Sequence, residues 1–316
     1  MNLPELKEVQ VFSRFLFYVR TFFHQKGYIE VETPLLNPFA TPEPYIDSFQ
    51  IVSDKNYYLI TSPEFNLKTL LKTYQTNLFQ IAHVFRKGDE SKHHKQEFLM
   101  LEWYHLNYNE FQIIEEIKEL LQYLSLNINE FEKIKQFHIV SMKQLFNDYL
   151  NTNYDKESLI QIIKENRLVE NKKILTLDKE DYDDLFFIVF LTLIEPKLET
   201  DSPLFIYGYP KELRAYSKIN ENLPEESRRF EMYWKNLEIA NGYCEIIDQK
   251  EQINQFKKEY EKRKKLNKPI FPISQSFLNS FPLPDCAGVS IGLERLYMAF
   301  RNINDITKIS FSGKFY

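Results

Sequence analysis

The residues best suited to chemistry in this chain lie in one charged stretch, FRKGDESKHHKQEFLMLEWY, at 85–104. Arg86 is near the start of the stretch, and Glu102 lies near its end within an apolar segment. An arginine and a buried carboxylate in such surroundings are costly unless a charged group lies between them. The pattern therefore predicts a strand, a charged loop and a returning strand around a charged ligand.

Two further blocks carry residues of the same kind. Glu238 and Glu245 flank IANGYC, and Arg295 follows GVSIGLE at the expected start of a helix. Arginine side chains match phosphate oxygens, and a hard cation bridges carboxylate and phosphate, so these residues together with Arg86 suit a polyphosphate and Mg²⁺ site. Surface salt bridges are the alternative, because no Walker-type loop or GxGxxG fingerprint is present.

The neighbouring segments predict the elements that position these blocks. Apolar residues at helical spacing predict a first helix that stops at Gly27, and IEVETPLLNP alternates as a strand. NYYLITSPEFNLKTLLKTY predicts a strand and then a helix, and RRFEMYWKNLEIANGYCEIID predicts a hairpin that turns near Lys235 and Asn236. Strands grouped with helices outside them, without βαβ alternation, favour an antiparallel α+β fold.

Composition excludes several other classes of protein. The 316 residues carry a formal net charge of -5, which gives no general basic surplus for binding nucleic acid. Cys244 and Cys286 lack CxxC spacing, which argues against a zinc site or a disulfide framework and fits a reducing cytoplasm. The longest apolar run, LFFIVFLTLI at 185–194, is too short to span a bilayer, so we expect a buried helix there and no membrane segment.

Taken together and in this order, the blocks resemble the catalytic domain of class II aminoacyl-tRNA synthetases. IEVETPLLNP is similar to motif 1 of that family, FRKGDESKHHKQEFLMLEWY to motif 2 and GVSIGLERL to motif 3. TSPEFNLKTLL, EFLMLEWY and LEIANGYCEIID resemble its lysine branch. The resemblance covers nearly the whole chain and implies an antiparallel sheet flanked by helices, with a mostly helical insertion at about 108–200.

The resemblance implies that the protein binds ATP and Mg²⁺. Arg86 would hold the α-phosphate, Phe98 would stack on adenine, and Arg295 would bind the γ-phosphate. Glu238 and Glu245 would bind the metal. Because the two acids are seven residues apart, an unbroken strand would place them on opposite faces. Binding one metal therefore requires a β-bulge, for which Asn241-Gly242 is suited. The ATP-binding residues implied by the family pattern are Arg86, Lys87, Gly88, Asp89, His94, Lys95, Phe98, Glu238, Ile239, Gly292 and Arg295.

The lysine branch further implies a substrate with two ammonium groups, which an acidic, hydrogen-bonding set of residues would bind. That set is Ser62, Pro63, Glu64, Glu102, Tyr104, Asn241, Glu245 and Ser290. A structural role is the alternative. Glu102 and Tyr104 would then only belong to a capped strand face, and Glu64 would be a carboxylate at a helix N-terminus, stabilised by the helix dipole.

Motif 1 begins about thirty residues from Met1, which leaves no room for an anticodon-binding domain, so we expect 1–316 to be a single catalytic domain. A free-standing domain of this length resembles the elongation factor P lysyltransferase family. That family activates (R)-β-lysine and transfers it to a lysine side chain of elongation factor P. The resemblance implies a cytoplasmic homodimer, with Pro34 and the first helix near the two-fold axis, that leaves tRNA uncharged.

Four departures from the family pattern concern the ligand sites. Lys95 and Gln96 stand where motif 2 usually has asparagine and proline, and Lys87 replaces a common small or amide residue. Ser290 stands where this family tends to have alanine and lysyl-tRNA synthetases have glycine, at the floor of the amino-acid pocket. Its added bulk and hydroxyl favour (R)-β-lysine over α-lysine as the substrate.

Two other functions stay open at this point. The chain could be a tRNA or small-molecule ligase that uses the same adenylate chemistry, or a non-catalytic relative that binds an amino acid and regulates a partner. Arg86, Arg295, Glu238 and Glu245 weigh against the non-catalytic alternative. The missing anticodon module weighs against tRNA.

Overall fold

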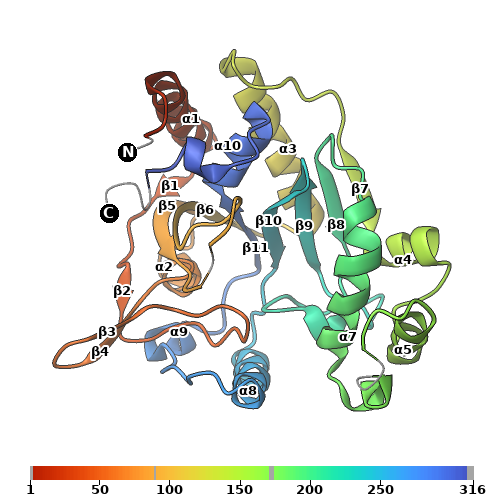
Figure 1. Cartoon of the computed structure of the whole chain (residues 1–316). Helices are drawn as coiled ribbons and strands as arrows, with labels where there is room; N and C mark the ends of the chain where they lie inside the picture. The colour runs from red at the N-terminus through yellow and green to blue at the C-terminus, as the bar shows by residue number, and fades with distance from the viewer. Residues whose placement is uncertain (1–2, 89, 171–173, 312–316) are drawn as a thin grey trace.

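A computed structural model describes residues 3–88, 90–170 and 174–311 (Figure 1). Its helices are α1 (Leu6–Gln25), α2 (Glu64–Tyr74), α3 (Glu110–Asn127), α4 (Met142–Leu150), α5 (Lys156–Glu165), α7 (Tyr182–Val189), α8 (Gln249–Lys265), α9 (Gln275–Asn279) and α10 (Leu293–Arg301). Its strands are β1 (Ile29–Glu30), β2 (Leu36–Asn37), β3 (Gln50–Val52), β4 (Asn56–Leu59), β5 (Leu78–Phe85), β6 (Glu97–Leu106), β7 (His138–Ser141), β8 (Leu204–Tyr207), β9 (Arg229–Trp234), β10 (Leu237–Cys244) and β11 (Cys286–Gly292).

The central element is an eight-stranded sheet in the order β1-β5-β6-β11-β10-β9-β8-β7. Neighbouring strands run antiparallel except at the two edges, where β1 pairs parallel with β5 and β7 with β8. This confirms the expected α+β fold with a mostly antiparallel sheet. The strand expected at 29–38 is split, because Pro34 has no N–H to donate to a ladder; β1 joins the large sheet and β2 joins the small sheet β2-β4-β3.

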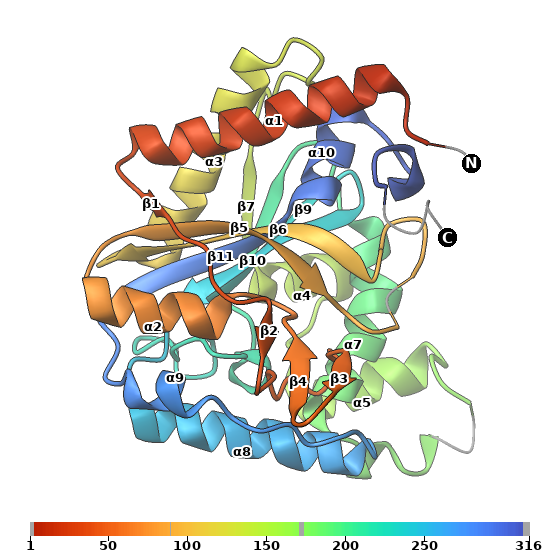
Figure 2. The ribbon, with the colours of Figure 1, turned by 90° about the vertical axis from the view of Figure 1, so that its left-hand side faces the viewer.

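Helices α1, α3 and α10 cover one face of the large sheet (Figure 2). In α1 the apolar side chains that recur at helical spacing are all buried there: Val11, Phe15, Val19, Phe22 and Phe23. Trp103 of β6 and Phe79 of β5 point into the same core. The helix ends at Gln25, and Gly27 with its φ of 78° closes it, which confirms the predicted stop.

Helices α2, α8 and α9 lie on the opposite side of the sheet (Figure 2). Leu67 and Leu71 of α2 pack on Leu78 and Tyr104 at one end of that face. A separate cluster, in which Phe65 stacks on Phe277, joins α2 to α8 and α9. Because these helices cover only part of the second face, a cavity lies against the strands in the middle of the sheet.

The segment expected to be a mostly helical insertion contains α3, α4, α5 and α7, together with strand β7 at the edge of the sheet. Helices α4, α5 and α7 bury an apolar cluster of their own, which includes Phe146, Ile163 and Phe186. Helix α7 and one π-helical turn, Phe190–Ile194, form the apolar run at 185–194. The expectation of a buried helix is only partly correct, because Leu191 is 50% exposed. No helix in the described ranges is long and apolar enough to cross a membrane.

The β9-β10 hairpin turns where the sequence predicts it. Lys235 and Asn236 have φ values of 51° and 59°, the left-handed conformation that a two-residue hairpin turn requires at both positions. Thr200 holds this turn, since its carbonyl accepts from Lys235 N at 2.7 Å and its hydroxyl accepts from Asn236 N at 2.8 Å. The hairpin brings β10 beside β11 in the centre of the sheet.

Candidate active site

Strand register collects the predicted substrate-binding residues on one face of the sheet. Ser290 of β11 pairs with Glu102 of β6 on one side and with Asn241 of β10 on the other. Directly paired residues point to the same face, so these three side chains form a row along the floor of a cavity of about 510 Å³. Tyr104 and Tyr243 flank Gly288 in the next row.

Most of the expected ligand-binding residues line this cavity. Those that do are Ser62, Glu64, Arg86, His94, Lys95, Phe98, Glu102, Tyr104, Glu238, Ile239, Asn241, Glu245, Ser290, Gly292 and Arg295. Pro63, Lys87 and Gly88 are not among the lining residues: Pro63 is buried at the start of α2, and Lys87 and Gly88 are exposed. Asp89 lies outside the described residues.

A β-bulge brings Glu238 to the cavity face, at a different place from the one expected. Glu238 pairs with Tyr233 and Ala240 pairs with Met232, so the extra residue is Ile239. Pairing through Asn241 and Gly242 is regular on both sides, and the expectation of a bulge there is wrong. Gly242 instead serves packing, because a Cβ would lie 2.6 Å from the Phe230 ring. The bulge shifts the alternation by one residue, so that residues 238 and 241 share a face.

Glu102 is held by hydroxyl groups at the floor of the cavity. Ser62 Oγ donates to Glu102 Oε2 at 2.6 Å, and Tyr104 Oη donates to Oε1 at 2.7 Å. Ser62 Oγ also accepts from Glu64 N at 3.0 Å, which orients the first turn of α2. Burial, and then the charge of Glu64, raise the pKa of Glu102 because two carboxylates share this apolar setting.

Lys68 is a site residue that sequence reasoning missed. Its Nζ forms ion pairs with Glu64 and with Glu245, and all three side chains are buried. Tyr243 Oη also donates to Glu64 Oε1, at 3.2 Å. The available signal was the spacing: Lys68 lies four residues after Glu64 on α2, where the two side chains meet, among apolar neighbours that bury them.

Three carboxylates and one lysine therefore lie together here, in what we call the amine pocket: Glu64, Glu102 and Glu245 with Lys68, which pairs with Glu64 and Glu245. Glu245 is only 1% exposed, and its Oε1 has no hydrogen-bond partner among the described residues. Burial raises the pKa of Glu245 in spite of Lys68. A buried carboxylate oxygen without a donor is costly, so the pocket suits a ligand that brings positive charge and N–H donors.

Glu245 does not fit the expected metal site. Strand β10 extends from Leu237 to Cys244 and advances about 3.3 Å per residue, so the Cα atoms of Glu238 and Glu245 are roughly 20 Å apart. Two carboxylates at that separation cannot both approach one Mg²⁺ to about 2.1 Å. Of these two acids it is Glu238 that lies at the other end of the cavity, where it is exposed.

The end of the cavity around Glu238 carries the arginines. Arg295 Nη1 donates to Glu238 O at 2.9 Å, and its Nε donates to His93 O at 3.2 Å, which joins α10 to the loop at 86–96. The Arg86 guanidinium lies 5.3 Å from the ring centroid of Phe98, and its buried Nε has no hydrogen-bond partner in the described part of the chain. A Cβ on Gly292 would meet nothing within 4 Å, so open space lies beside this backbone.

Polar side chains in the loop between β5 and β6 contact one another. His94 Nδ1 and Ser91 Oγ are 2.8 Å apart, and Lys95 Nζ lies 3.4 Å from Glu90 Oε1. Glu294 of α10 anchors the returning strand, since both its oxygens accept from Leu99 N at 3.0 Å. Glu294, like Lys68 and Tyr243, was not predicted as a site residue; it reached the site only through the packing of α10 on β6.

Comparison with known proteins identifies a family and several proteins to which this chain is similar. The family described as "tRNA synthetases class II (D, K and N)" matches residues 4–314. A protein of Buchnera aphidicola subsp. Schizaphis graminum is 36% identical over 318 residues, covering 97% of this chain and 96% of that protein. A protein of Avibacterium paragallinarum is 34% identical over 304 residues, covering 92% and 91%. One of Haemophilus ducreyi is 31% identical over 310 residues, covering 95% and 92%. All three are named "Elongation factor P--(R)-beta-lysine ligase".

Proposed function

Because the chain belongs to the class II tRNA synthetases of the D, K and N type, and to the elongation factor P–(R)-β-lysine ligases among them, we propose that it is an ATP-dependent ligase with that activity. It activates (R)-β-lysine as an aminoacyl-adenylate and transfers the aminoacyl group to a lysine side chain of elongation factor P. tRNA is not an acceptor. The protein works in the cytoplasm, in keeping with its two buried free cysteines.

The observation that supports this proposal best is the charge of the amine pocket. Buried Glu64 and Glu245 share Lys68, buried Glu102 accepts hydrogen bonds from Ser62 and Tyr104, and Glu245 Oε1 lacks a donor among the described residues. A diamino acid brings positive charge to this acidic pocket, and its terminal ammonium suits Glu245. At the other end of the same cavity, the Nε of Arg86, which has no hydrogen-bond partner within the described ranges, suits a phosphate or an activated carboxylate.

Activation takes place at the arginine end of the cavity. The carboxylate oxygen of the amino acid attacks the α-phosphorus of ATP, a new O–P bond forms, and the bond to the β-phosphate breaks to release pyrophosphate. Arg86 neutralises the charge that develops on the α-phosphate, and Arg295 holds the outer phosphates. Phe98 stacks on the adenine. Glu238 would hold Mg²⁺, which usually takes one or two carboxylates and completes its ligand shell with phosphate oxygens and water.

Transfer follows within the same cavity. The ε-amine of the acceptor lysine attacks the carbonyl carbon of the adenylate, a C–N bond forms, and the C–O bond breaks so that AMP leaves. The amine attacks only when it is deprotonated, so the rate of transfer rises with pH until another step limits it. The hydrogen bonds of Ser62 and Tyr104 keep Glu102 in place beside the amino acid during both steps.

Ser290 selects the position of the second ammonium group. It lies between Glu102 and Asn241 on the cavity floor, with its Oγ 3.5 Å from Asn241 O. A side chain there crowds an α-ammonium, whereas a β-ammonium is displaced by one carbon and can reach the hydroxyl. The pocket therefore favours (R)-β-lysine over α-lysine.

The protein assembles as a homodimer through the region of motif 1. Exposed apolar side chains occur on α1 and on the strands that follow it, among them Phe17, Ile29, Leu36 and Val52. A C₂ interface uses the same surface on both subunits, so a dimer formed through this region would cover such side chains.

A parallel assay tests the activity. Purified protein is incubated with ATP, Mg²⁺ and either (R)-β-lysine or α-lysine, and exchange of pyrophosphate into ATP is measured first. Elongation factor P and tRNA are then offered separately as acceptors. We expect exchange with (R)-β-lysine in preference to α-lysine and modification of the factor alone. Charged tRNA with an unmodified factor would replace this proposal by that of a tRNA ligase, and binding without exchange would indicate a non-catalytic protein.

A further inference from the structure

Glu43 lines the cavity but belongs to none of the three family motifs. It lies in the loop between β2 and β3, which runs from the small sheet towards α8 (Figure 1). The local sequence is Pro42-Glu43-Pro44, so both neighbours have a restricted φ. The residue is therefore presented to the cavity by a segment with little backbone freedom.

A buried arginine of α8 holds this loop in place. Arg263 Nη1 donates to the carbonyl of Glu43 at 2.7 Å and to that of Ile46 at 3.1 Å, and Nη2 donates to Asp47 Oδ1 at 2.7 Å. The Arg263 side chain has no exposed surface. Tyr45 Oη also donates to Asp183 Oδ2 at 2.7 Å, at the start of α7. These contacts fix the backbone of Glu43 before any ligand binds.

Glu43 lines the same cavity as Glu64 of the amine pocket and Arg86 of the phosphate end. The charges that act on it most are those of Glu64, of Arg86 and of Arg229 on β9, whose Nε donates to Asn241 Oδ1 on the cavity floor at 3.2 Å. A substrate that places its carboxylate at Arg86 and its terminal ammonium at Glu245 has its second ammonium one or two carbons from the carboxylate. That ammonium would lie at the junction of the two ends, within the cavity that Glu43 lines.

The energetics favour a cation at this junction. Burial raises the pKa of Glu43, and the charge of Glu64 raises it further. A carboxylate in such a setting is costly to keep ionised without a positive partner, and an ammonium group supplies both charge and donors.

We propose that Glu43 recognises the ammonium group nearest the reacting carboxylate, and so selects diamino acids over amino acids that carry only a terminal ammonium. This inference rests on the proposed activation of (R)-β-lysine and adds a specificity residue to it. Glu43 complements Ser290: Ser290 decides where the second ammonium is placed, and Glu43 requires that it be present.

The test compares Glu43→Gln with wild type in pyrophosphate exchange. Gln keeps the size of the side chain and removes its charge. The KM for (R)-β-lysine is measured, together with the inhibition constant of 6-aminohexanoic acid, which has the carboxylate and the terminal ammonium but lacks the second one. We expect the variant to raise the KM for (R)-β-lysine on the order of 10- to 100-fold, the loss of one charge-assisted hydrogen bond. The inhibition constant of 6-aminohexanoic acid and the KM for ATP should stay within about twofold.

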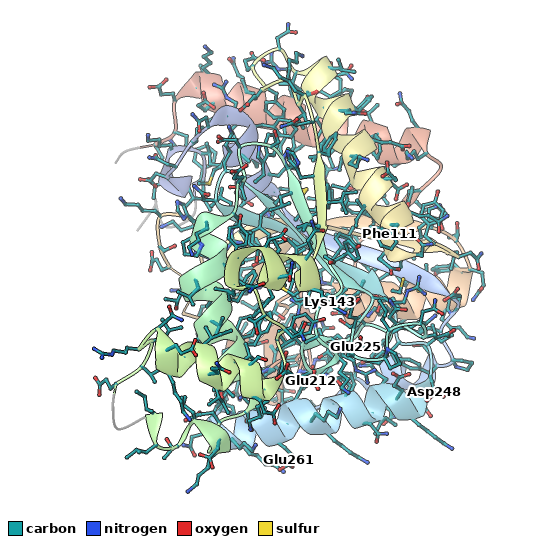
Figure 3. The ribbon with its side chains drawn as sticks, turned by 90° about the vertical axis from the view of Figure 1, so that its right-hand side faces the viewer. Phe111, Lys143, Glu212, Glu225, Asp248 and Glu261 are labelled. Atoms are coloured by element: carbon teal, nitrogen blue, oxygen red, sulfur yellow. The ribbon has the colours of Figure 1, made fainter. Side chains whose placement is uncertain are left out.

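Glu261→Gln is the matched control, because Glu261 carries the same charge on the outer side of α8 and points into solvent (Figure 3). It should leave all three constants unchanged. An equal loss for 6-aminohexanoic acid in Glu43→Gln would show contact with the terminal ammonium or a general disturbance, and would overturn the inference, as would an unchanged KM for (R)-β-lysine. Absence of exchange in the wild type with every amino acid would instead overturn the proposed function itself.

Discussion

Two glycines on β11 face the cavity, and adding one methyl group to each should have opposite consequences. A Cβ on Gly288 would lie 2.4 Å from two ring carbons of Tyr104, whereas a Cβ on Gly292 would meet no atom within 4 Å. Neither residue has a positive φ. Alanine is therefore sterically allowed by the backbone at both positions, and only the surroundings distinguish Gly288→Ala from Gly292→Ala.

The expected loss of stability in Gly288→Ala follows from the displacement of Tyr104. Carbon atoms in contact are normally about 3.5–4.0 Å apart, so the ring must move by about 1 Å or more. Overpacking of this kind costs about 1–3 kcal/mol. The movement also stretches the 2.7 Å hydrogen bond from Tyr104 Oη to buried Glu102, which adds about 1–3 kcal/mol. We expect a total of about 2–6 kcal/mol, a large part of the stability of an ordinary domain. Gly292→Ala should change stability by less than about 1 kcal/mol.

Urea denaturation of the two variants measures these free energies, and pyrophosphate exchange measures the ligand sites. Gly288→Ala should raise the KM for the amino acid, because Tyr104 lines the amine end of the cavity. Gly292→Ala should raise the KM for ATP on the order of 10-fold and leave that for the amino acid unchanged, because its methyl group enters the space assigned to the nucleotide. Wild-type stability in Gly288→Ala would refute the packing argument. A KM for ATP unchanged in Gly292→Ala would refute the placement of the nucleotide.

Three further expectations concern catalysis, pH and assembly. Arg86→Ala should slow pyrophosphate exchange on the order of 10²-fold or more, since it removes a charge-assisted contact made mainly in the transition state, and normal exchange would refute its role. Glu102 and Glu245 have folded pKa values raised above their ordinary 4.5, so the folded protein holds protons that the unfolded chain releases. The stability of the ligand-free protein should therefore fall as pH rises from about 4.5 through these raised pKa values. The increase in Tm on adding (R)-β-lysine should be larger at pH 8 than at pH 6, and scanning calorimetry that finds the reverse would contradict the pocket electrostatics. Sedimentation at micromolar concentration should show a dimer, and a fully active monomer would exclude the proposed interface.

The sequence by itself determined the features that depend on local interactions and on motif order. Helical spacing before Gly27 predicted α1, and the turn at Lys235 and Asn236 was correct because its geometry depends on a few adjacent residues. Arg86 and Arg295 were assigned to one site because motifs 2 and 3 carry them in a fixed order, and the structure does place both at the cavity.

Only the tertiary structure decided how the acidic residues are shared between the two ends of the cavity. The bulge lies at Ile239, since β10 must pair with β9 and β11 at once, and a single sequence does not reveal the register of three strands. Lys68 pairs with Glu64 on the same helix and also with Glu245, 177 positions further along the chain, which helical spacing alone could not indicate. The length of an extended strand then separates Glu245 from Glu238, so that two acids assigned to one metal serve different ends of the site.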